Sequence, residues 1–273
     1  MNKIREWKAV LLPYDQAVQE IKIKMKSIRN EYRELNEYSP IEFVTGRVKK
    51  ISSILEKAKR RDIPEDMITE LMEDIAGIRI MCQFKDDIYK VVNLIRKRNG
   101  KDLFIVYEKD YINDYKESGY RSYHIIIKYP VQTAFGEKEI LVELQIRTLA
   151  MNFWATIEHS LKYKYKENIP EKIELRLIRA AEAAALLDEE MYEIRKEIIN
   201  AQLAFEEKSN IVADITNNIQ ILSLSGKMKE AIDLQNRFDK LWKDGTQEDL
   251  IELLKEIKEY LPRYKMFENG YKE

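Results

Sequence analysis

The sequence predicts an α+β fold in which a mixed sheet is flanked by helices and followed by long C-terminal helices. Short apolar runs at 74–83, 104–107, 122–129 and 140–148 have the length and apolar density of buried strands. Other segments place apolar residues at steps of three and four, which is the period of an amphipathic helix. Because the two patterns are interspersed along the chain, we expect helices packed against one sheet.

Composition limits the classes of protein to which this chain can belong. Its 273 residues allow one large domain, or one domain with an appendage. With 35% charged residues and a net charge of −1, any affinity for phosphate or nucleic acid must come from local patches. The two histidines, His124 and His159, argue against a multi-histidine metal centre, and the single Cys82 excludes an internal disulfide. No apolar run is long enough to span a membrane and the first residues do not form a signal peptide, so we expect a cytoplasmic protein without a membrane partner.

The first long helix is predicted to end at Ser39-Pro40, and it carries two stripes. The apolar stripe consists of Val18, Ile21, Met25, Ile28, Tyr32 and Leu35. The second stripe is basic and consists of Lys22, Lys26, Arg29 and Arg33. A basic stripe is usually a solvated face, and the alternative interpretation is an anion site.

The segment from 47 to 61 contains seven basic residues and the single acid Glu56. If this segment is helical, side chains four residues apart share one face, namely Lys49, Ser53, Lys57 and Arg61. A row of ammonium, hydroxyl and guanidinium groups suits a chain of phosphates. Pro64 then begins a further helix that we expect to end near Glu73.

Two predicted strands carry polar side chains in places where burial is expected. Asp74 lies at the start of the strand 74–83, and Arg79 lies further along it. In the strand 140–148, the apolar Ile140, Val142, Leu144 and Ile146 point one way, whereas Leu141, Glu143, Gln145 and Arg147 point the other. Three polar side chains on one face of a central strand are costly to bury without a partner or a ligand. This pattern indicates a site.

A polar loop with one glycine, residues 115–124, opens directly into the apolar run Ile125–Ile127. Tyr120 and His124 flank two further polar side chains there, and loops at the end of a sheet often carry function. We therefore expect this loop to hold a guanine nucleotide. Asp74 and Glu143 are oxygen ligands of the kind that bind Mg²⁺ jointly with a nucleotide triphosphate, although each alone is equally compatible with an ordinary salt bridge. No glycine-rich phosphate-binding motif occurs, so side chains must hold the triphosphate.

The last part of the chain is predicted to be helical. A helix from about 150 to 165 places Asn152, Thr156 and His159 on one side, and His159 is more typical of a structural histidine than of a catalytic one. A long helix from 171 to about 205 is rich in alanine and charge, as expected of a packing or oligomer-building element. Three further helical patterns follow residue 210; the first ends at Gly226, and Thr246 with Asp249 resembles a capping box at the start of the last. We expect no chemistry in this tail.

Five stretches of the chain together resemble the small alarmone synthetases of the RelQ type, which are related to the synthetase domain of the Rel/SpoT family. The stretches occur in the family's order and comprise Arg47–Lys57, Asp74–Arg79, Lys116–His124, Glu143–Thr148 and Asn152–His159. No stretch is specific alone, but five in register are. The resemblance covers roughly residues 5 to 205. It implies a nucleotidyltransferase-like synthetase fold with a mixed five-stranded sheet over residues 1–170, an oligomerisation helix over 171–208 and a helical extension of unknown role over 209–273.

The resemblance also implies an activity, which is Mg²⁺-dependent transfer of pyrophosphate from ATP to the 3′-hydroxyl of GDP or GTP. The products would be AMP and the stringent-response alarmones ppGpp or pppGpp, and synthesis without hydrolysis is expected because the hydrolase half is absent. In this family Arg47 and Arg79 would sandwich the adenine, and the ATP phosphates would contact Lys49, Ser53, Lys57 and a neighbouring arginine, Arg60 or Arg61. Asp74 would carry Mg²⁺, and Glu143 would share it and activate the acceptor hydroxyl. Tyr120 would stack on guanine and Asn152 would read its edge, while the acceptor phosphates and ribose would contact Lys116, His124 and Gln145.

The resemblance further implies a homotetramer with a central cleft that binds the product as an allosteric effector. The positions that match this cleft are Lys22, Lys26, Arg29, Phe43 and Thr45. The chain departs from its long relatives at Tyr115-Lys116 and at Ser118, which leaves the choice between GDP and GTP open. Two alternatives remain: a synthetase that uses another acceptor such as GMP, and a non-catalytic regulator that binds guanine nucleotides or single-stranded RNA.

Overall fold

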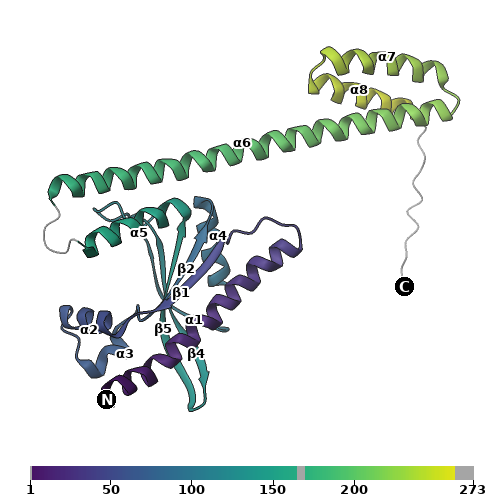
Figure 1. Ribbon diagram of the computed structural model, residues 1–273. Coiled ribbons are helices and arrows are strands. Elements are labelled where there is room, and N and C mark those ends of the chain that lie inside the picture. Colours follow the sequence, from purple (N-terminus) through teal and green to yellow (C-terminus); the bar gives the residue numbers. More distant parts are fainter. Residues whose placement is uncertain (1, 165–169, 262–273) are drawn as a thin grey trace, which may run out of the picture. The chain divides into compact units, whose positions relative to one another are not determined.

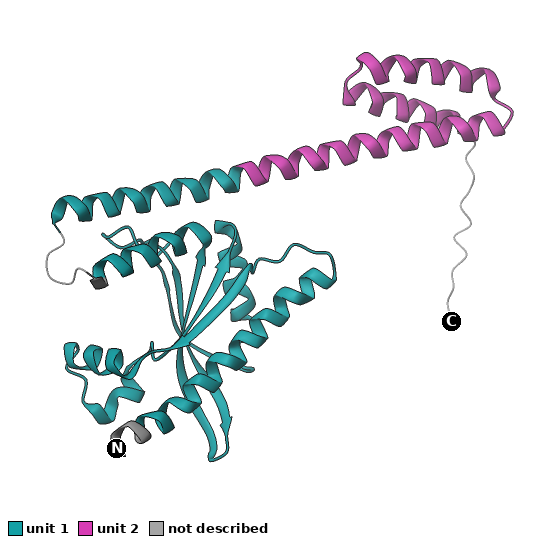
Figure 2. Ribbon diagram, in the orientation of Figure 1, with its two compact units in different colours: residues 1–193 teal, residues 194–273 magenta. Residues whose placement is uncertain are grey.

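The computed structural model describes residues 2–164 and 170–261. The chain divides into two compact units, Met1–Glu193 and Ile194–Glu273 (Figure 2). Within the described residues, no helix is both long enough and apolar enough to cross a membrane.

The first unit is built on one five-stranded sheet (Figure 1). Its strands are β1 (Phe43–Val48), β2 (Ala76–Cys82), β3 (Phe104–Asp110), β4 (Tyr123–Thr133) and β5 (Gly136–Thr148), in the spatial order β1-β2-β5-β4-β3. The central pair β2–β5 is parallel and the other three pairs are antiparallel. The predicted mixed sheet and α+β class are therefore confirmed.

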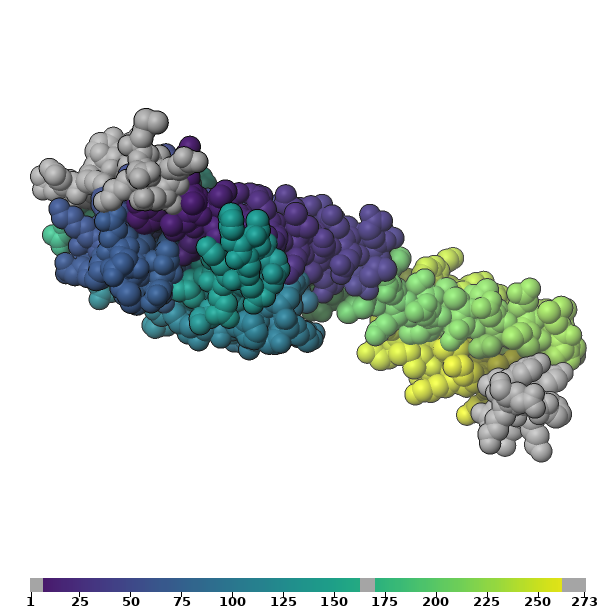
Figure 3. Space-filling view, turned by 90° about the horizontal axis from the view of Figure 1, so that it is seen from below, coloured from purple at the N-terminus to yellow at the C-terminus, as the bar shows by residue number. Residues whose placement is uncertain are grey.

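The helices of this unit precede, connect and follow the strands along the chain. They are α1 (Asn2–Glu34), α2 (Ile51–Arg60), a 3₁₀ turn (Glu65–Met67), α3 (Ile68–Leu71), α4 (Lys85–Arg96), α5 (Leu149–Lys164) and the first part of α6 (Glu171–Leu224). On the molecular surface, α1 lies next to the β4–β5 hairpin (Figure 3), and the Gln16 side chain donates to the Gln132 carbonyl of that hairpin.

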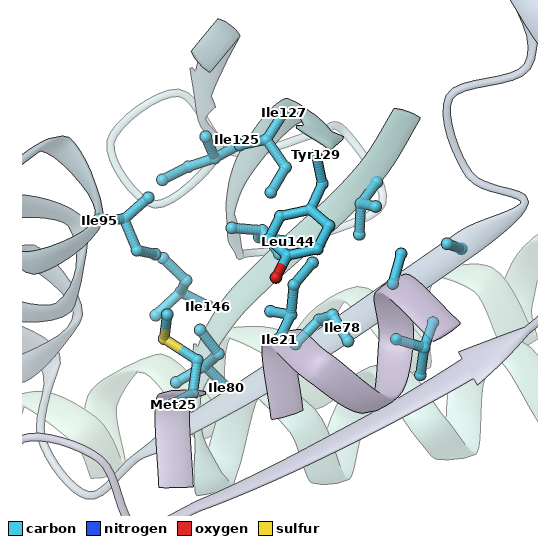
Figure 4. Close-up of a cluster of buried hydrophobic side chains, with 14 of the residues drawn as sticks. Ile21, Met25, Ile78, Ile80, Ile95, Ile125, Ile127, Tyr129, Leu144 and Ile146 are labelled. Carbon is cyan, nitrogen blue, oxygen red and sulfur yellow. The ribbon is translucent and has the colours of Figure 1, made fainter. Parts of the chain in front are cut away.

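One face of the sheet is apolar and packs against α1 and α4. Figure 4 shows Ile21 and Met25 of α1 and Ile95 of α4 directed towards the isoleucines and Leu144 of β2, β4 and β5. The predicted apolar stripe of the first helix is buried here at Val18, Ile21 and Met25, each of which contributes roughly 1.5–3 kcal/mol. Because every second strand residue enters this core, the alternate residues must face the other side of the sheet. That other face carries the polar side chains.

The basic segment from 47 to 61 does not form the single helix that its spacing predicted. It begins as the edge strand β1, and α2 starts only at Ile51. The reason is the core, because Val44 is buried against β2 and Gly46 lies so close to α1 that an added Cβ would be 2.9 Å from Val18 Cγ1. Lys49 therefore lies in the link between strand and helix and does not continue the helical row of Ser53 and Lys57.

The long helix α6 also differs from its prediction, since it continues past residue 205 to Leu224. No glycine or proline interrupts the sequence between 171 and 224, and Gly226, two residues after the helix ends, adopts a φ of +87°. The end of α6 packs with α7 (Met228–Asp244) and α8 (Gln247–Tyr260) around a separate apolar core in the second unit. The predicted capping box of Thr246 and Asp249 is confirmed at the start of α8.

Within the first unit, α6 is tied to the sheet by a buried hydrogen bond. The Thr148 hydroxyl, at the end of β5, donates to Asp188 Oδ2 at 2.6 Å, and Asp188 is 6% exposed. Burial raises the pKa of Asp188 from 3.8 to about 6, although the Thr148 hydrogen bond acts in the opposite direction. The folded state therefore holds the Asp188 proton more tightly than the unfolded chain does.

Replacing Asp188 with asparagine is expected to remove a pH-dependent loss of stability. With a raised pKa, the stabilisation is present below pH 3.8 and is lost as pH rises through about 6. Asparagine stays neutral and can still accept from Thr148, so the variant should be more stable than wild type at pH 7.5. A shift of about two pKa units allows at most about 3 kcal/mol. Denaturant unfolding at pH 5 and pH 7.5 measures this difference, with the exposed Glu190→Gln on the same helix as control. An advantage that does not grow with pH would contradict the assignment.

Candidate active site

The polar face of the sheet brings together residues that are far apart in the sequence. Strand register places Glu143 beside Gly77, and Gln145 between Arg79 and His124. On the outer strands, Thr45 pairs with Arg79, and Lys109 pairs with His124. Residues of this face therefore form a continuous polar surface, and the predicted site on β5 lies at its centre.

Asp74 is held by two lysines. Lys49 Nζ lies 2.7 Å and Lys57 Nζ 2.5 Å from the same carboxylate oxygen, Oδ2. Burial alone would raise the pKa of Asp74, but the hydrogen bonds and charges of the two lysines outweigh it and lower the pKa. The second oxygen, Oδ1, is buried and has no hydrogen-bond partner. An ionised carboxylate with one buried free oxygen is suited to bind a cation.

Glu143 is oriented by two donors. His124 Nδ1 lies 3.0 Å from Oε1, and Gln145 Nε2 donates to Oε2 at 2.8 Å. Burial would raise the pKa of Glu143, but the contact with His124 outweighs this effect, so the pKa is lowered. Glu143 is therefore an ionised carboxylate whose direction is fixed by its neighbours.

A chain of hydrogen bonds extends from a buried arginine to Glu143. Arg147 is 4% exposed and donates from Nη2 to the Tyr120 hydroxyl at 2.5 Å, which in turn lies 2.8 Å from His124 Nε2. Because arginine only donates, the Tyr120 oxygen accepts from it, and the same hydroxyl shares a second hydrogen bond with His124 Nε2. His124 Nδ1 faces the ionised carboxylate of Glu143, which can only accept, so Nδ1 donates to it. The loop residue Tyr120 is thus connected to the central carboxylate.

Three adjoining cavities lie on this face of the sheet, and two of them contain both carboxylates. The first, of about 280 Å³, contains Arg47, Arg79 and both carboxylates. The second, of about 490 Å³, is mainly basic and is lined by Arg47, Lys49, Lys50, Ser53, Glu56, Lys57, Arg60 and His159. The third, of about 230 Å³, has aromatic and basic walls formed by Tyr107, Lys109, Tyr111, Lys116 and Arg61, and includes Asp74 and Glu143. The carboxylates therefore lie at the junction between the first and third cavities.

Comparison with known proteins identifies the family of this chain. A family model described as "Region found in RelA / SpoT proteins" matches residues 46–168. Over 204 residues the chain is 61% identical to GTP pyrophosphokinase YjbM of Bacillus subtilis (strain 168), covering 75% of this chain and 95% of that protein. The chain belongs to the RelA/SpoT family. The family assignment made from the five motifs is thus confirmed.

Two solved structures of the RelA/SpoT family show the same fold. Small alarmone synthetase 1 from Bacillus subtilis bound to its product pppGpp has a TM-score of 0.68 and 60% identity, covering 71% of this chain and 98% of that chain. The same synthetase bound to AMPCPP has a TM-score of 0.63 and 56% identity, covering 72% of this chain and 99% of that chain. In both comparisons the matched region therefore includes nearly all of the relative's chain, whereas more than a quarter of this chain has no counterpart in it.

The structure separates two arginines that the motif left as alternatives. Arg60 lines the basic cavity with Lys49 and Ser53, whereas Arg61 lines the third cavity with Lys116. His159 also faces the basic cavity. The buried Oδ1 of Asn152 has no hydrogen-bond partner, which leaves it open to a donor from a ligand.

Three residues of this polar face were not identified from the sequence, namely Tyr107, Lys109 and Tyr111. The Lys116 ammonium lies 4.7 Å from the ring centre of Tyr111 and 5.1 Å from that of Tyr120, and Tyr111 packs edge-on against His124. The predicted strand ended at Tyr107, although β3 continues to Asp110. Extending the alternation by two residues would have placed Lys109 on the same face as His124.

The predicted effector residues lie on both sides of the edge strand β1. Lys22, Lys26 and Arg29 lie on α1, and Arg29 donates to the Glu42 carbonyl at 3.2 Å. Phe43 and Thr45 alternate with the buried Val44, so they face the polar side of the sheet, where Thr45 lines the first cavity. Their role as an effector site stays a prediction.

Proposed function

We propose that this chain is a GTP pyrophosphokinase that transfers pyrophosphate from ATP to the 3′-hydroxyl of GDP or GTP. In this reaction the 3′-oxygen forms a bond to the β-phosphorus of ATP and the bond between that phosphorus and the α-bridging oxygen breaks. AMP leaves with the electron pair, and ppGpp or pppGpp forms. The observation that carries the proposal is the position of two ionised carboxylates, Asp74 and Glu143, at the junction between the first cavity, which contains Arg47 and Arg79, and the aromatic third cavity.

The basic side would hold the donor. Lys49, Ser53, Lys57 and Arg60 line one wall and offer ammonium, hydroxyl and guanidinium donors to a triphosphate. Arg47 and Arg79 line the adjoining cavity, where planar guanidinium groups can stack on a base. A triphosphate would compete with Asp74 for the two lysines and so release the carboxylate from its ion pairs.

The aromatic side would hold the acceptor. Tyr120 offers a ring for stacking on guanine, and Asn152 offers a free buried oxygen to an N–H on the edge of the base. Lys116, Lys109 and Arg61 line the third cavity and would contact the acceptor phosphates.

Glu143 would take the proton of the 3′-hydroxyl as the new bond forms. Its orientation by His124 and Gln145 holds one carboxylate oxygen at a fixed place, so positioning is largely complete before substrate binds. The lowered pKa of Glu143 is compatible with this role. The 3′-hydroxyl becomes more acidic as its oxygen bonds to phosphorus, and only then does its proton move to Glu143. The proton then passes to solvent.

We also propose that the reaction requires Mg²⁺. The buried free oxygen of Asp74 and the carboxylate of Glu143 would hold the ion, and within residues 2–164 and 170–261 no cluster of three histidine, cysteine or acidic residues offers a complete protein site. Nucleotide phosphates would therefore supply further oxygen ligands. When bound, the ion neutralises charge on the phosphates.

The activity is tested with purified full-length protein, ATP and Mg²⁺, with GDP, GTP or GMP as acceptor. We expect AMP and a 3′-pyrophosphorylated guanine nucleotide in equal amounts, identified by anion exchange and ³¹P NMR. A product from GMP but not from GDP or GTP would favour the synthetase with another acceptor. Binding of guanine nucleotide or single-stranded RNA without any transfer would favour the non-catalytic regulator and refute the proposal.

We further propose a cytoplasmic homotetramer in which the product binds as an effector at the basic face of α1. The basic spacing of Lys22, Lys26 and Arg29 supports a phosphate-binding role. Replacing Lys26 with alanine is then expected to abolish activation by added pppGpp without changing the basal rate. Initial rates with and without pppGpp measure this effect, and Arg33→Ala on the same helix is the control. Unchanged activation in the Lys26 variant would argue against the effector site.

A further inference from the structure

The loop expected to bind the acceptor, residues 115–124, is packed closely against the first turns of α6 at Gly119 and Arg121. Gly119 adopts a φ of +83°, a conformation that favours glycine. A Cβ atom built on Gly119 would lie 2.5 Å from Ala181 Cβ and 3.7 Å from the Ile178 carbonyl oxygen. Neither position has space for a larger side chain, so the distance between loop and helix is set by a glycine facing an alanine.

Polar contacts hold the loop and α6 in this arrangement. Arg121 Nη1 donates to the Gly119 carbonyl at 3.2 Å and to the Ala181 carbonyl at 3.5 Å, so one guanidinium group joins both partners. The same guanidinium lies 4.2 Å from the ring centre of Tyr115. Trp154 Nε1 of α5 donates to the Leu177 carbonyl at 2.8 Å, which fixes α6 to α5, and this part of α6 runs along α5 in Figure 2.

Tyr120 packs on the surface created by these contacts. Trp154, Ala155 and Ala181 form a small buried apolar cluster, with Tyr120 and Ala184 packed against it. The ring proposed to stack on guanine is therefore supported by α5 and α6, while its hydroxyl is held by Arg147 and His124. A displacement of α6 at Ala181 would move the ring and disturb its link to Glu143. No residue of α6 lines the basic cavity proposed for ATP, but Tyr120 shares a further cavity with Arg47 and Arg79, so a smaller effect is expected on ATP than on the acceptor.

We propose that Ala181 is a positioning residue for the acceptor nucleotide, and that the first turns of α6 determine how tightly GDP or GTP binds, with a much smaller effect on ATP. The inference rests on the proposed function for the identity of the two ligands. The position of Ala181 is independent of the motifs of the acceptor loop, because the residue lies about 60 positions further along the chain. It is a positioning residue since it would act through Gly119 and Tyr120 and would not touch the substrate.

The test compares Ala181→Leu with Ala183→Leu in the full-length protein. Ala181 is 3% exposed and faces the loop, whereas Ala183 is exposed on the same helix, so the two variants add the same side chain in different surroundings. We expect Ala181→Leu to raise the KM for GDP and its dissociation constant about tenfold or more, a size that overpacking at a binding surface produces. The KM for ATP should stay within about twofold, and Ala183→Leu should behave like wild type.

Two further variants keep the test decisive if Ala181→Leu does not fold. Arg121→Gln removes the bridging guanidinium without adding volume and should weaken GDP binding while leaving the KM for ATP unchanged. Gly119→Ala should weaken GDP binding strongly, and adding Ala181→Gly should recover part of that loss because it removes the opposing Cβ. Circular dichroism and size-exclusion chromatography establish folding and assembly for each variant.

The outcomes separate this inference from the proposed function. GDP affinity is measured by calorimetry and needs no turnover, whereas the proposed function is judged by AMP release in the wild type. Wild-type GDP affinity in both Ala181→Leu and Arg121→Gln would overturn the inference. A parallel loss of ATP affinity, or an equal effect of Ala183→Leu, would also overturn it.

Discussion

Replacing Glu143 with glutamine is expected to reduce kcat by about a thousandfold or more, which is within the range of losing a general base. Glutamine has nearly the same volume but cannot accept the proton of the 3′-hydroxyl. It also has only one acceptor atom, whereas His124 Nδ1 and Gln145 Nε2 each donate to a separate oxygen of Glu143. One of the two donors would lose its partner, so the geometry of the site would be disturbed together with its chemistry.

The effect should be much larger on turnover than on ATP binding. Arg79 donates to Gln145, which in turn donates to Glu143, and Asp74 remains to hold the cation, so the KM for ATP should change by less than about tenfold. The matched control is Glu139→Gln, because Glu139 lies on the same strand with an exposed side chain beside Lys128. Steady-state kinetics with each substrate varied in turn measure kcat and the KM for ATP and for the acceptor. Turnover within about tenfold of wild type would exclude Glu143 as the proton acceptor.

The sequence was sufficient to locate the site wherever strand alternation applied. On β5 the apolar residues Ile140, Val142, Leu144 and Ile146 are all buried, and Glu143 and Gln145 face the other side as predicted. This succeeded because a central strand has one apolar face and because a polar residue on it is costly unless it is used. The pairing of β5 with β2 and β4 then placed Arg79 and His124 beside it.

Prediction failed where local charge and tertiary packing disagree. The segment from 43 to 48 is an edge strand, whereas the four-residue spacing from Lys49 to Arg61 predicts a helix for the basic segment that starts at Arg47. Only the closeness of Gly46 to Val18 and Ile78 explains why it is extended, and this contact involves residues that are distant in the sequence. The sequence could not decide whether Arg60 or Arg61 faces the basic cavity for the same reason. The answer depends on the orientation of α2 relative to β1, which tertiary packing sets.

The contact between the acceptor loop and α6 could not be predicted from the sequence for a related reason. A glycine in a polar loop and an alanine in an alanine-rich helix are both common, and neither is informative alone. Their meaning appears only when the fold brings Gly119 and Ala181 together. The hydrogen bond between Thr148 and Asp188 is another such case, since it joins the end of β5 to a helix 40 positions later.

Asp74 is the second position at which one substitution should abolish activity, and the contacts with two lysines make its effects separable. In Asp74→Asn the side chain keeps its size but loses its charge, so Lys49 and Lys57 would face each other without a counterion. We expect turnover to fall by about a thousandfold or more, because charge neutralisation at the phosphates is a major part of such catalysis. Stability at pH 7.5 should also fall, by about 1–3 kcal/mol.

The stability effect has a defined pH dependence. The folded state lowers the pKa of Asp74, so its contribution is present above the unfolded value of 3.8 and is lost as pH falls through the folded pKa. The difference in unfolding free energy between wild type and Asp74→Asn should therefore be largest near neutral pH and should shrink towards pH 3. Urea unfolding at several pH values measures it, with the exposed Asp66→Asn as the control.

ATP binding distinguishes a cation-binding carboxylate from a merely structural one. In the variant, the lysines are no longer occupied by Asp74 and are available to phosphates, so ATP without Mg²⁺ should bind at least as tightly as it does to wild type. The same ATP should gain less affinity from added Mg²⁺, because the free buried oxygen of Asp74 has been replaced by part of a neutral amide. Calorimetric titrations with EDTA and with Mg²⁺ measure both effects. If Asp74→Asn weakens ATP binding equally in the two conditions, Asp74 serves to hold Lys49 and Lys57 in place and does not bind the cation.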